Sequence, residues 1–414
     1  MEYIEELGLK AKTAEPVITS LKVSEKNAVL AEIAKRLRRD SAVLIEANAL
    51  DIAAAENNGM SKAMIDRLTL TEARIEGMAE GVDTVIALPD PIGSVIGGSE
   101  LANGLRVVKK RVPIGTIGII FESRPNVTVD AAALCFKAGN TVILRGGSDA
   151  INSNKALVKL MRGAVKDCGF DENAIQLVED TSRSVANAMM KLNKYIDLLI
   201  PRGGGGLIRT VIENATIPVI QTGEGNCHVY VDATADIEMA VNIVNNAKTQ
   251  RPSVCNAIEN VIVHKDAAPA FFEKISALWQ DKVSVIGDEG VSKLINVEKI
   301  ADDNDFATEF LDYKISAKIV DSVDEAIAHI NRFGTKHSEC IITSDLNNAD
   351  KFQKMVDAAA VYVNASTRFT DGFEFGLGAE IGISTQKLHA RGPMGLEALT
   401  TYKYLINGNG QIRG

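Results

Sequence analysis

One cysteine of the sequence stands where a thiol could act as a nucleophile. Cys255 lies within residues 250–257, which read QRPSVCNA, between an expected helix and an expected strand. Polar residues and a proline around a thiol indicate an accessible loop, in which an activated thiolate can attack a carbonyl carbon. Most cysteines are small core residues, and we interpret the others in this way: Cys135, Cys168, Cys227 and Cys340. Cys227 could also lie near a cleft, because it follows the polar stretch 223–226.

A side-chain amide follows the first strand expected in the central part of the chain. Residues 121–128 read FESRPNVT, so that Asn126 comes shortly after the apolar run 115–121. Ligands collect at the carboxyl edge of a parallel sheet, where such an amide can donate a hydrogen bond to a developing oxyanion. Asparagine also caps many helices, so a purely structural role is equally open.

Two more expected strand ends carry groups that suit a phosphate. Gly203–Gly206 follow an apolar run and precede an expected helix, where backbone N–H groups can approach a phosphate closely. The spacing is not that of a dinucleotide-binding fingerprint, so a flexible turn explains it equally well. Arg145 and Ser148, within residues 144–148, supply a cation and a hydroxyl but no carboxylate. Arginine can hold a ribose 2′-phosphate, although an ordinary surface arginine is the alternative.

These residues need a scaffold that gathers strand ends, and the hydrophobic pattern predicts one. The first 90 residues read as helical, and Asn103-Gly104 predicts a tight turn in a hairpin over 93–112. From residue 114 onward apolar runs alternate with helical stretches, which predicts two α/β domains with parallel sheets. The first set of expected strands covers 115–121, 141–144, 174–178, 196–200 and 218–220. The second covers 257–263, 283–286, 316–320, 339–343 and 360–363, followed by a strand-like stretch within 397–414.

The composition excludes several other classes of protein. The chain has 414 residues, of which 46% are hydrophobic and 24% charged, as in ordinary globular proteins of two or three domains. A net charge of −9 makes nucleic acid an improbable partner. No apolar run approaches the roughly 18 residues that cross a bilayer, and the acidic start is no secretory signal, so we expect no membrane partner. Five widely spaced cysteines favour a reducing, cytoplasmic setting without disulfides or a metal site.

Three long strings of residues together resemble the aldehyde dehydrogenase superfamily, and within it the branch that reduces glutamyl 5-phosphate. They are residues 121–128, 250–257 and 376–393, the last of which reads GLGAEIGISTQKLHARGP. The match is collinear over nearly the whole chain. It implies an α/β fold of the aldehyde dehydrogenase type, in which two α/β domains with parallel sheets carry a small β oligomerisation element.

The resemblance also implies roles for individual residues. Cys255 corresponds to the nucleophile of the family and Asn126 to the amide that donates to the oxyanion. Glu309 matches the glutamate that holds the nicotinamide ribose, and Arg145 falls where a lysine usually faces the adenine ribose. Ser148 stands where NAD-preferring relatives often carry a glutamate, which indicates NADP(H) as the cofactor. The predicted cofactor-binding residues are Arg145, Ser148, Gly203, Gly204, Gly206 and Glu309.

One departure from the family pattern bears on the reaction. Hydrolytic members place a water-activating glutamate two residues before a Gly-Gly pair, but here Thr222 takes that place and Glu224 is displaced. A missing base suits an enzyme whose acyl group is exchanged with phosphate instead of water. The resemblance therefore implies NADPH-dependent reduction of L-glutamyl 5-phosphate to glutamate 5-semialdehyde through a Cys255 thioester, in proline biosynthesis. A CoA-acylating aldehyde dehydrogenase is the alternative among enzymes, and a catalytically silent NADP-binding protein is the alternative outside them.

Basic side chains must receive the phosphate and carboxylate of such a substrate. The candidates are Arg124, Lys387, His389 and Arg391, each of which could equally serve a structural salt bridge.

The resemblance divides the chain into N-terminal helices with a cofactor domain over 1–225, a catalytic domain over 226–395 and a tail over 396–414. It implies a homo-oligomer built through the hairpin 93–112 and the tail. It also implies a functional link to glutamate 5-kinase, which supplies the unstable acyl phosphate.

Overall fold

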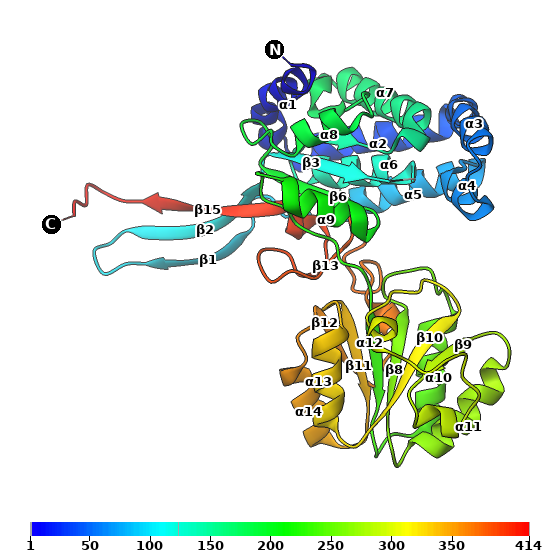
Figure 1. Cartoon of the computed structure of the whole chain (residues 1–414). Coiled ribbons are helices and arrows are strands. Elements are labelled where there is room, and N and C mark those ends of the chain that lie inside the picture. The colour runs from blue at the N-terminus through cyan, green and yellow to red at the C-terminus, as the bar shows by residue number, and fades with distance from the viewer. Residues whose placement is uncertain (1, 123, 414) are drawn as a thin grey trace. The chain divides into compact units, whose positions relative to one another are not determined.

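The chain folds into two compact units, which the computed structural model describes over residues 2–122 and 124–413. Unit 1 holds the described residues up to Gln221, together with Gly376–Gly382 and the chain from Met394 onward (Figure 1). Unit 2 holds Thr222–Phe375 and Ile383–Pro393. The predicted functional boundaries at residues 225 and 395 stay predictions, because packing does not report on role.

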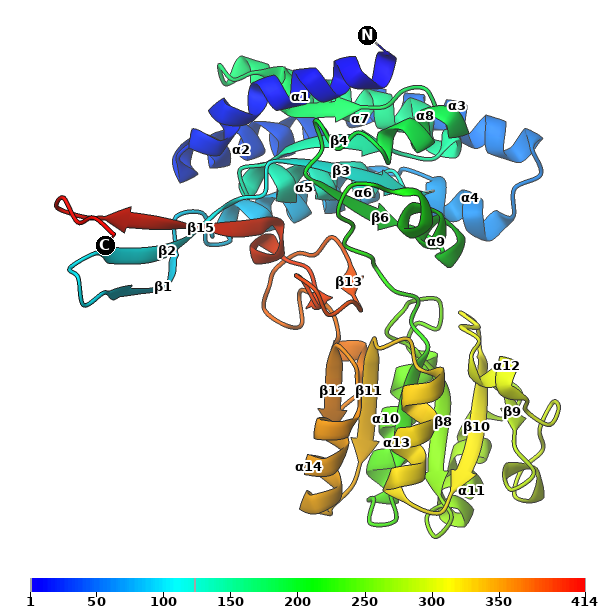
Figure 2. The same ribbon diagram turned by 60° about the vertical axis from the view of Figure 1, so that its left-hand side comes forward.

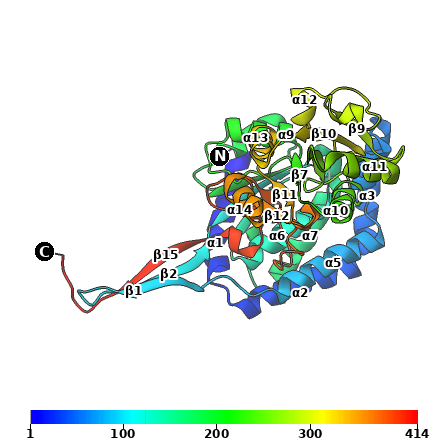
Figure 3. The same ribbon diagram turned by 90° about the horizontal axis from the view of Figure 1, so that it is seen from below.

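Unit 1 begins with five helices, where the apolar spacing predicted helices. They are α1 (Tyr3–Ser20), α2 (Val23–Arg39), α3 (Ser41–Asn57), α4 (Lys62–Leu68) and α5 (Glu72–Ala87). The buried face of α2 recurs at helical spacing, and this helix packs along α5 (Figure 3). The Thr71 hydroxyl caps α5 by accepting the N–H of Arg74. Gly59 follows the end of α3 in the left-handed conformation that stops helices.

A three-stranded antiparallel sheet extends away from the rest of unit 1 (Figure 1). The strands β1 (Val95–Glu100) and β2 (Arg106–Pro113) form the predicted hairpin, and Gly104 in its turn has a φ of +84°. The C-terminal strand β15 (Thr400–Asn407) pairs with β2 over its whole length. All residues of β15 except the first are exposed, and so is the whole of β1.

The main sheet of unit 1 is parallel, with helices on both sides (Figure 2). Its strands are β3 (Thr116–Phe121), β4 (Thr141–Arg145), β5 (Ile175–Leu177) and β6 (Leu198–Arg202), in the order β5-β4-β3-β6. The connecting helices are α6 (Asn126–Lys137), α7 (Ile151–Asp167), α8 (Arg183–Met189) and α9 (Gly205–Asn214). Right-handed crossovers place α6 and α7 on one face and α8 on the other, where it joins α1 in one apolar cluster. The strand expected over 218–220 is reduced to one bridge between Leu199 and Val219.

Unit 2 contains a second parallel sheet, in the order β12-β11-β7-β8-β10-β9. These strands are β7 (Cys227–Val231), β8 (Ile258–His264), β9 (Ser284–Gly287), β10 (Lys314–Val320), β11 (Ser338–Ile342) and β12 (Ala360–Val363). Its helices are α10 (Ile237–Thr249), α11 (Ala268–Trp279), α12 (Asp303–Phe306), α13 (Val323–Phe333) and α14 (Leu346–Met355). Helices α10 and α11 pack on the sheet in one apolar cluster, and α13 and α14 pack on it in another. Both faces of the sheet are therefore covered. A small antiparallel pair joins β13 (Ile383–Ser384) to β14 (Gly392–Pro393).

The predicted pair of α/β domains with parallel sheets and an additional β element is therefore confirmed. Within residues 2–122 and 124–413, no helix has both the length and the apolar character needed to cross a bilayer.

Candidate active site

The residues predicted to bind the cofactor in unit 1 share the carboxyl edge of its sheet. The parallel strands β4, β3 and β6 are neighbours, with Ile120 paired to Arg145 and Phe121 paired to Arg202. The segments that leave these strands therefore begin at the same edge, which is where ligands gather on such sheets. The predicted residues in these segments are Arg124, Asn126, Arg145, Ser148, Gly203, Gly204 and Gly206.

The guanidinium of Arg145 is half-buried and keeps an unused donor. Its Nη2 donates to the carbonyl oxygen of Thr181 over 2.8 Å. Its Nε is buried and has no partner among the described residues, and burial lowers the pKa of the group. An unsatisfied buried donor costs about 1–3 kcal/mol, so an anion that accepted this N–H would be bound favourably. Ser148 lies nearby in sequence, in a short turn before α7.

The glycine-rich turn before α9 binds the carboxylate of Glu122. The N–H of Gly204 donates to Oε2 of Glu122 over 3.0 Å. A Cβ on Gly203 would lie 2.4 Å from the same oxygen, so this glycine is needed for the close approach. The free N–H groups at a helix N-terminus attract anions, and Glu122 satisfies one of them here. Sequence reasoning missed Glu122, although an acidic residue directly after a strand was a usable signal.

The predicted oxyanion donor Asn126 is the first residue of α6. Its side-chain Nδ2 donates to Oδ2 of Asp130, one turn further along, over 3.0 Å. Burial raises the pKa of Asp130 to about 6, against the opposing effects of the Asn126 amide and the charge of Arg202. A carboxamide has two N–H groups, so this bond leaves the second one for a ligand. The preceding loop carries Arg124, which is half-buried.

In unit 2 the predicted residues lie at the opposite end of the strands, the amino edge. Cys255 comes just before β8, in the loop that follows α10. Glu309 comes before β10, and Lys336 and Asp357 come before β11 and β12. The predicted site residues thus follow strands in one sheet and precede them in the other.

The segment that leads into β7 contacts the loop of Cys255. The thiol of Cys227 donates to the carbonyl oxygen of Cys255 over 3.2 Å. Gly225 touches the same carbonyl group, since a Cβ on it would lie 1.6 Å from that oxygen. Burial holds the pKa of the Cys227 thiol well above its ordinary value, so this cysteine supports the loop rather than reacting. The interpretation that Cys227 could lie near a cleft stays a prediction.

One arginine, Arg368, interacts electrostatically with Cys255, which is half-buried. Nε of Arg368 donates to Oε1 of Gln250 over 2.9 Å, which joins the segment after β12 to the nucleophile loop. Burial lowers the pKa of Arg368, and the charge of neighbouring Arg251 lowers it further. Positive charge near a thiol favours the reactive thiolate. Sequence reasoning missed Arg368, because nothing local in the sequence signals a contact made so far along the chain.

Glu309 binds Gly225, the residue that touches the carbonyl group of Cys255. Its Oε1 accepts the N–H of Gly225 over 2.7 Å. Burial raises the pKa of Glu309, and the hydrogen bond from Gly225 opposes that shift.

Two of the predicted anion-binding residues share one carboxylate. Nζ of Lys387 and Nη2 of Arg391 lie 2.9 and 2.7 Å from Asp357. Lys336 joins them at 3.3 Å. Hydrogen bonds from Lys387, Arg391 and Lys336 lower the pKa of Asp357. Three cations around one carboxylate leave positive charge in excess, and the exposed His389 lies between Lys387 and Arg391 with a φ of +64°.

The position predicted to lack a water-activating base is filled by a buried threonine. Thr222 forms an antiparallel bridge with Ser384, and only 3% of its surface is exposed. Glu224 is exposed on the next turn of the chain.

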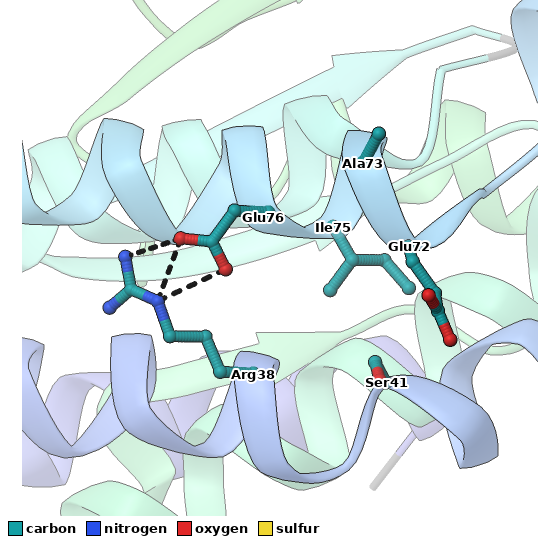
Figure 4. A pocket seen from close by; sticks show the side chains of 6 residues that line it. All are labelled: Arg38, Ser41, Glu72, Ala73, Ile75 and Glu76. Carbon is teal, nitrogen blue, oxygen red and sulfur yellow. Dashed lines mark hydrogen bonds and ion pairs between the residues drawn. The ribbon is translucent and has the colours of Figure 1, made fainter.

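A surface hollow elsewhere in unit 1 has no connection with these residues. Helices α2, α3 and α5 line it with Arg38, Ser41, Glu72, Ala73, Ile75 and Glu76 (Figure 4). Arg38 is already paired with Glu76 and Asp83. We assign no function to this hollow.

Residues 2–290 match the model of the aldehyde dehydrogenase family. The chain belongs to this family, and the predicted class, an oxidoreductase of aldehyde dehydrogenase type, is confirmed. Within the family it is 58% identical to gamma-glutamyl phosphate reductase from Clostridium botulinum over 407 residues, which cover 98% of each chain. The crystal structure of gamma-glutamyl phosphate reductase from Thermotoga maritima matches it with a TM-score of 0.98 and 47% identity over 100% of both chains. An acetylating aldehyde dehydrogenase from Geobacillus thermoglucosidasius shares the fold, with a TM-score of 0.72 and 16% identity over 99% of this chain and 97% of that one.

Proposed function

We propose that this protein reduces L-glutamyl 5-phosphate to L-glutamate 5-semialdehyde and phosphate with NADPH, in proline biosynthesis. The observation that carries the proposal is the Cys255 loop, to which Arg368 is hydrogen-bonded through Gln250, in a chain 58% identical to a gamma-glutamyl phosphate reductase. The CoA-acylating alternative has weaker support, since the acetylating relative shares only 16% identity and the likeness shows the fold alone.

The chemistry of the proposal begins at the thiol of Cys255. Its thiolate attacks the γ-carbonyl carbon and forms a C–S bond, while the N–H of Cys255 donates to the oxygen that gains negative charge. The bond from carbon to the phosphate oxygen then breaks, so phosphate leaves and a thioester remains. The bound cofactor would supply the hydride that reduces this thioester to the aldehyde and frees the thiolate. Asn126 stays a prediction as the second oxyanion donor.

The residues of unit 1 fit a cofactor that carries a 2′-phosphate. The unpartnered Nε of Arg145 offers a charged donor to such a group, and Ser148 adds a hydroxyl without the repulsion of a carboxylate. The turn at Gly203–Gly206 presents N–H groups that suit the pyrophosphate, where Glu122 now serves as acceptor. In unit 2, Glu309 would hold the nicotinamide ribose.

The anions of the substrate would be received by basic residues. Lys387 and Arg391, gathered on Asp357, are our candidates together with His389 and Arg124. The buried Thr222 at the predicted base position supports transfer of the acyl group to phosphate in the reverse reaction, since no carboxylate there activates water.

The extended sheet β1-β2-β15 supports the proposal of a homo-oligomer, because its exposed side chains include Tyr402, Tyr404 and Ile406. An unstable acyl phosphate supports functional coupling to the glutamate 5-kinase that makes it. A cytoplasmic location stays a prediction.

The test runs the reaction in reverse, with glutamate 5-semialdehyde and NADP, and follows NADPH formation with phosphate, with CoA and with neither. We expect strict dependence on phosphate. Formation of NADPH with CoA alone would establish the acylating alternative, and formation without either acceptor would mean a hydrolytic dehydrogenase.

A further inference from the structure

The carbonyl group of Cys255 is contacted by two residues of the segment that leads into β7 and begins it. Cys227 donates its thiol to this oxygen over 3.2 Å, and Gly225 lies so close that a Cβ would be 1.6 Å away. The loop continues into Asn256, whose carbonyl oxygen accepts the hydroxyl of Thr367 over 2.7 Å. Gly225 is therefore packed directly against the backbone that carries the nucleophile.

Gly225 is itself fixed by Glu309. Oε1 of Glu309 accepts the N–H of Gly225 over 2.7 Å, in surroundings buried enough to raise the pKa of this carboxyl group. A hydrogen bond to a carboxylate in such surroundings is stronger than one between neutral groups in water. A shift of Gly225 by a few tenths of an ångström would press on or release the Cys255 carbonyl, because no free space separates them.

The segment of Glu309 is held in turn by a buried ion pair. Nζ of Lys248 lies 2.5 Å from Oε2 of Glu259, and neither side chain is exposed. The other oxygen of Glu259 accepts the N–H of Leu311 over 3.1 Å. Leu311 has a φ of +56°, a conformation rare for leucine, so the surrounding contacts determine the course of this segment. The buried ion pair thus fixes the backbone near Glu309, whose side chain binds Gly225.

We propose that Glu309 is a positioning residue for the nucleophile, which it orients through Gly225 before any cofactor is bound. This inference rests on the proposed role of Cys255 and adds to Glu309 a task beyond the nicotinamide ribose. A single carboxylate then contributes both to the cofactor site and to the shape of the nucleophile loop.

The experiment measures amide hydrogen exchange in the full-length chain without cofactor. In E309L, which removes the acceptor, we expect exchange about tenfold faster in residues 223–227 and also in 250–257. E309D, which keeps the charge but shortens the reach, should loosen both segments as well and covers the case in which E309L does not fold. E309Q keeps an oxygen that can accept the Gly225 N–H and should stay near the wild type.

The matched control is E298L, which removes an exposed glutamate of unit 2 that binds Lys314 and Ser284. Unchanged exchange of 250–257 in both E309L and E309D would overturn the inference, and so would an equal rise in E298L. NADPH affinity of the same variants reports the ribose contact separately. Retained turnover in C255A would instead defeat the proposed function, so the two failures are distinguishable.

Discussion

The two parallel sheets of this molecule use opposite edges. In unit 1, the predicted residues follow β3, β4 and β6, at the carboxyl ends of the strands. In unit 2, Cys255 and Glu309 precede β8 and β10, at the amino ends. The same architecture of a helix-covered parallel sheet therefore carries the predicted site residues at opposite edges in the two units.

The difference follows from the direction of the neighbouring helices. At a carboxyl edge the next helix begins, so its free N–H groups and positive end favour phosphate. At an amino edge the previous helix has just ended, and the carbonyl oxygens of its last turn repel an anion such as a thiolate. The segments at this edge of unit 2 carry cations on side chains: Arg251 and Arg368, which interact with each other, and Lys336, Lys387 and Arg391, which surround Asp357.

The largest expected effect is a loss of turnover without a loss of NADPH binding. It would distinguish the proposed role of Cys255 in unit 2 from that of the cofactor-binding residues predicted in unit 1. C255A removes the nucleophile and should lower turnover by about 10³-fold or more. NADPH binding, followed by the quenching of cofactor fluorescence, should change less than about twofold, because the phosphate-binding residues lie in unit 1. Turnover near the wild-type rate would show that Cys255 is not the nucleophile.

A second prediction concerns the packing of the amino edge. In G225A the added Cβ would lie 1.6 Å from the Cys255 carbonyl oxygen, so the loop must move. Displacing a nucleophile by about 1 Å can cost about 10²-fold, and we expect a fall of that size in kcat. The control is G77A, inside α5, where no atom lies within 4 Å of the added methyl group. Equal effects of the two substitutions on kcat would contradict the close packing that we describe.

The sequence predicted the carboxyl edge better than the amino edge, for physical reasons. Apolar runs alternate with helices in both units, and the rule that ligands follow parallel strands located Arg145 and Asn126. Cys255 was found from its polar loop, but its partners were not. Arg368 and Gly225 act through contacts between distant segments, and no local pattern of residues encodes such contacts. Likewise, the strand expected over 218–220 has apolar residues but forms only one bridge.

A third prediction tests whether Arg145, at the carboxyl edge of unit 1, recognises the 2′-phosphate of NADPH. R145Q removes a charged donor, and losing such a hydrogen bond costs about 1.5–3 kcal/mol. We expect the KM for NADPH to rise by about tenfold to a hundredfold, while the KM for NADH stays nearly constant. R145K keeps the positive charge but lacks the several N–H donors of a guanidinium group. Its KM for NADPH should therefore lie between the values of the wild type and R145Q. An equal change for both cofactors would mean that Arg145 supports the fold rather than the 2′-phosphate.

The smallest effect concerns stability, and it tests a partly buried carboxyl group at the carboxyl edge, where unit 2 has none of its predicted residues. Burial raises the pKa of Asp130 to about 6, above its ordinary value of 3.8. The folded state therefore favours the protonated form. The resulting contribution to stability is complete below pH 3.8 and is lost as the pH rises through 6.

Asparagine cannot ionise, so D130N should avoid this loss. Relative to the wild type, its free energy of unfolding should be about 2 kcal/mol higher at pH 8 than at pH 4.5, because part of the difference of about two pKa units is already lost at pH 4.5. Urea titrations followed by circular dichroism at the two pH values measure this difference. If D130N shows no such dependence, the Asp130 carboxylate is accommodated by its neighbours at no cost, and its bond to Asn126 then resembles an ordinary surface contact.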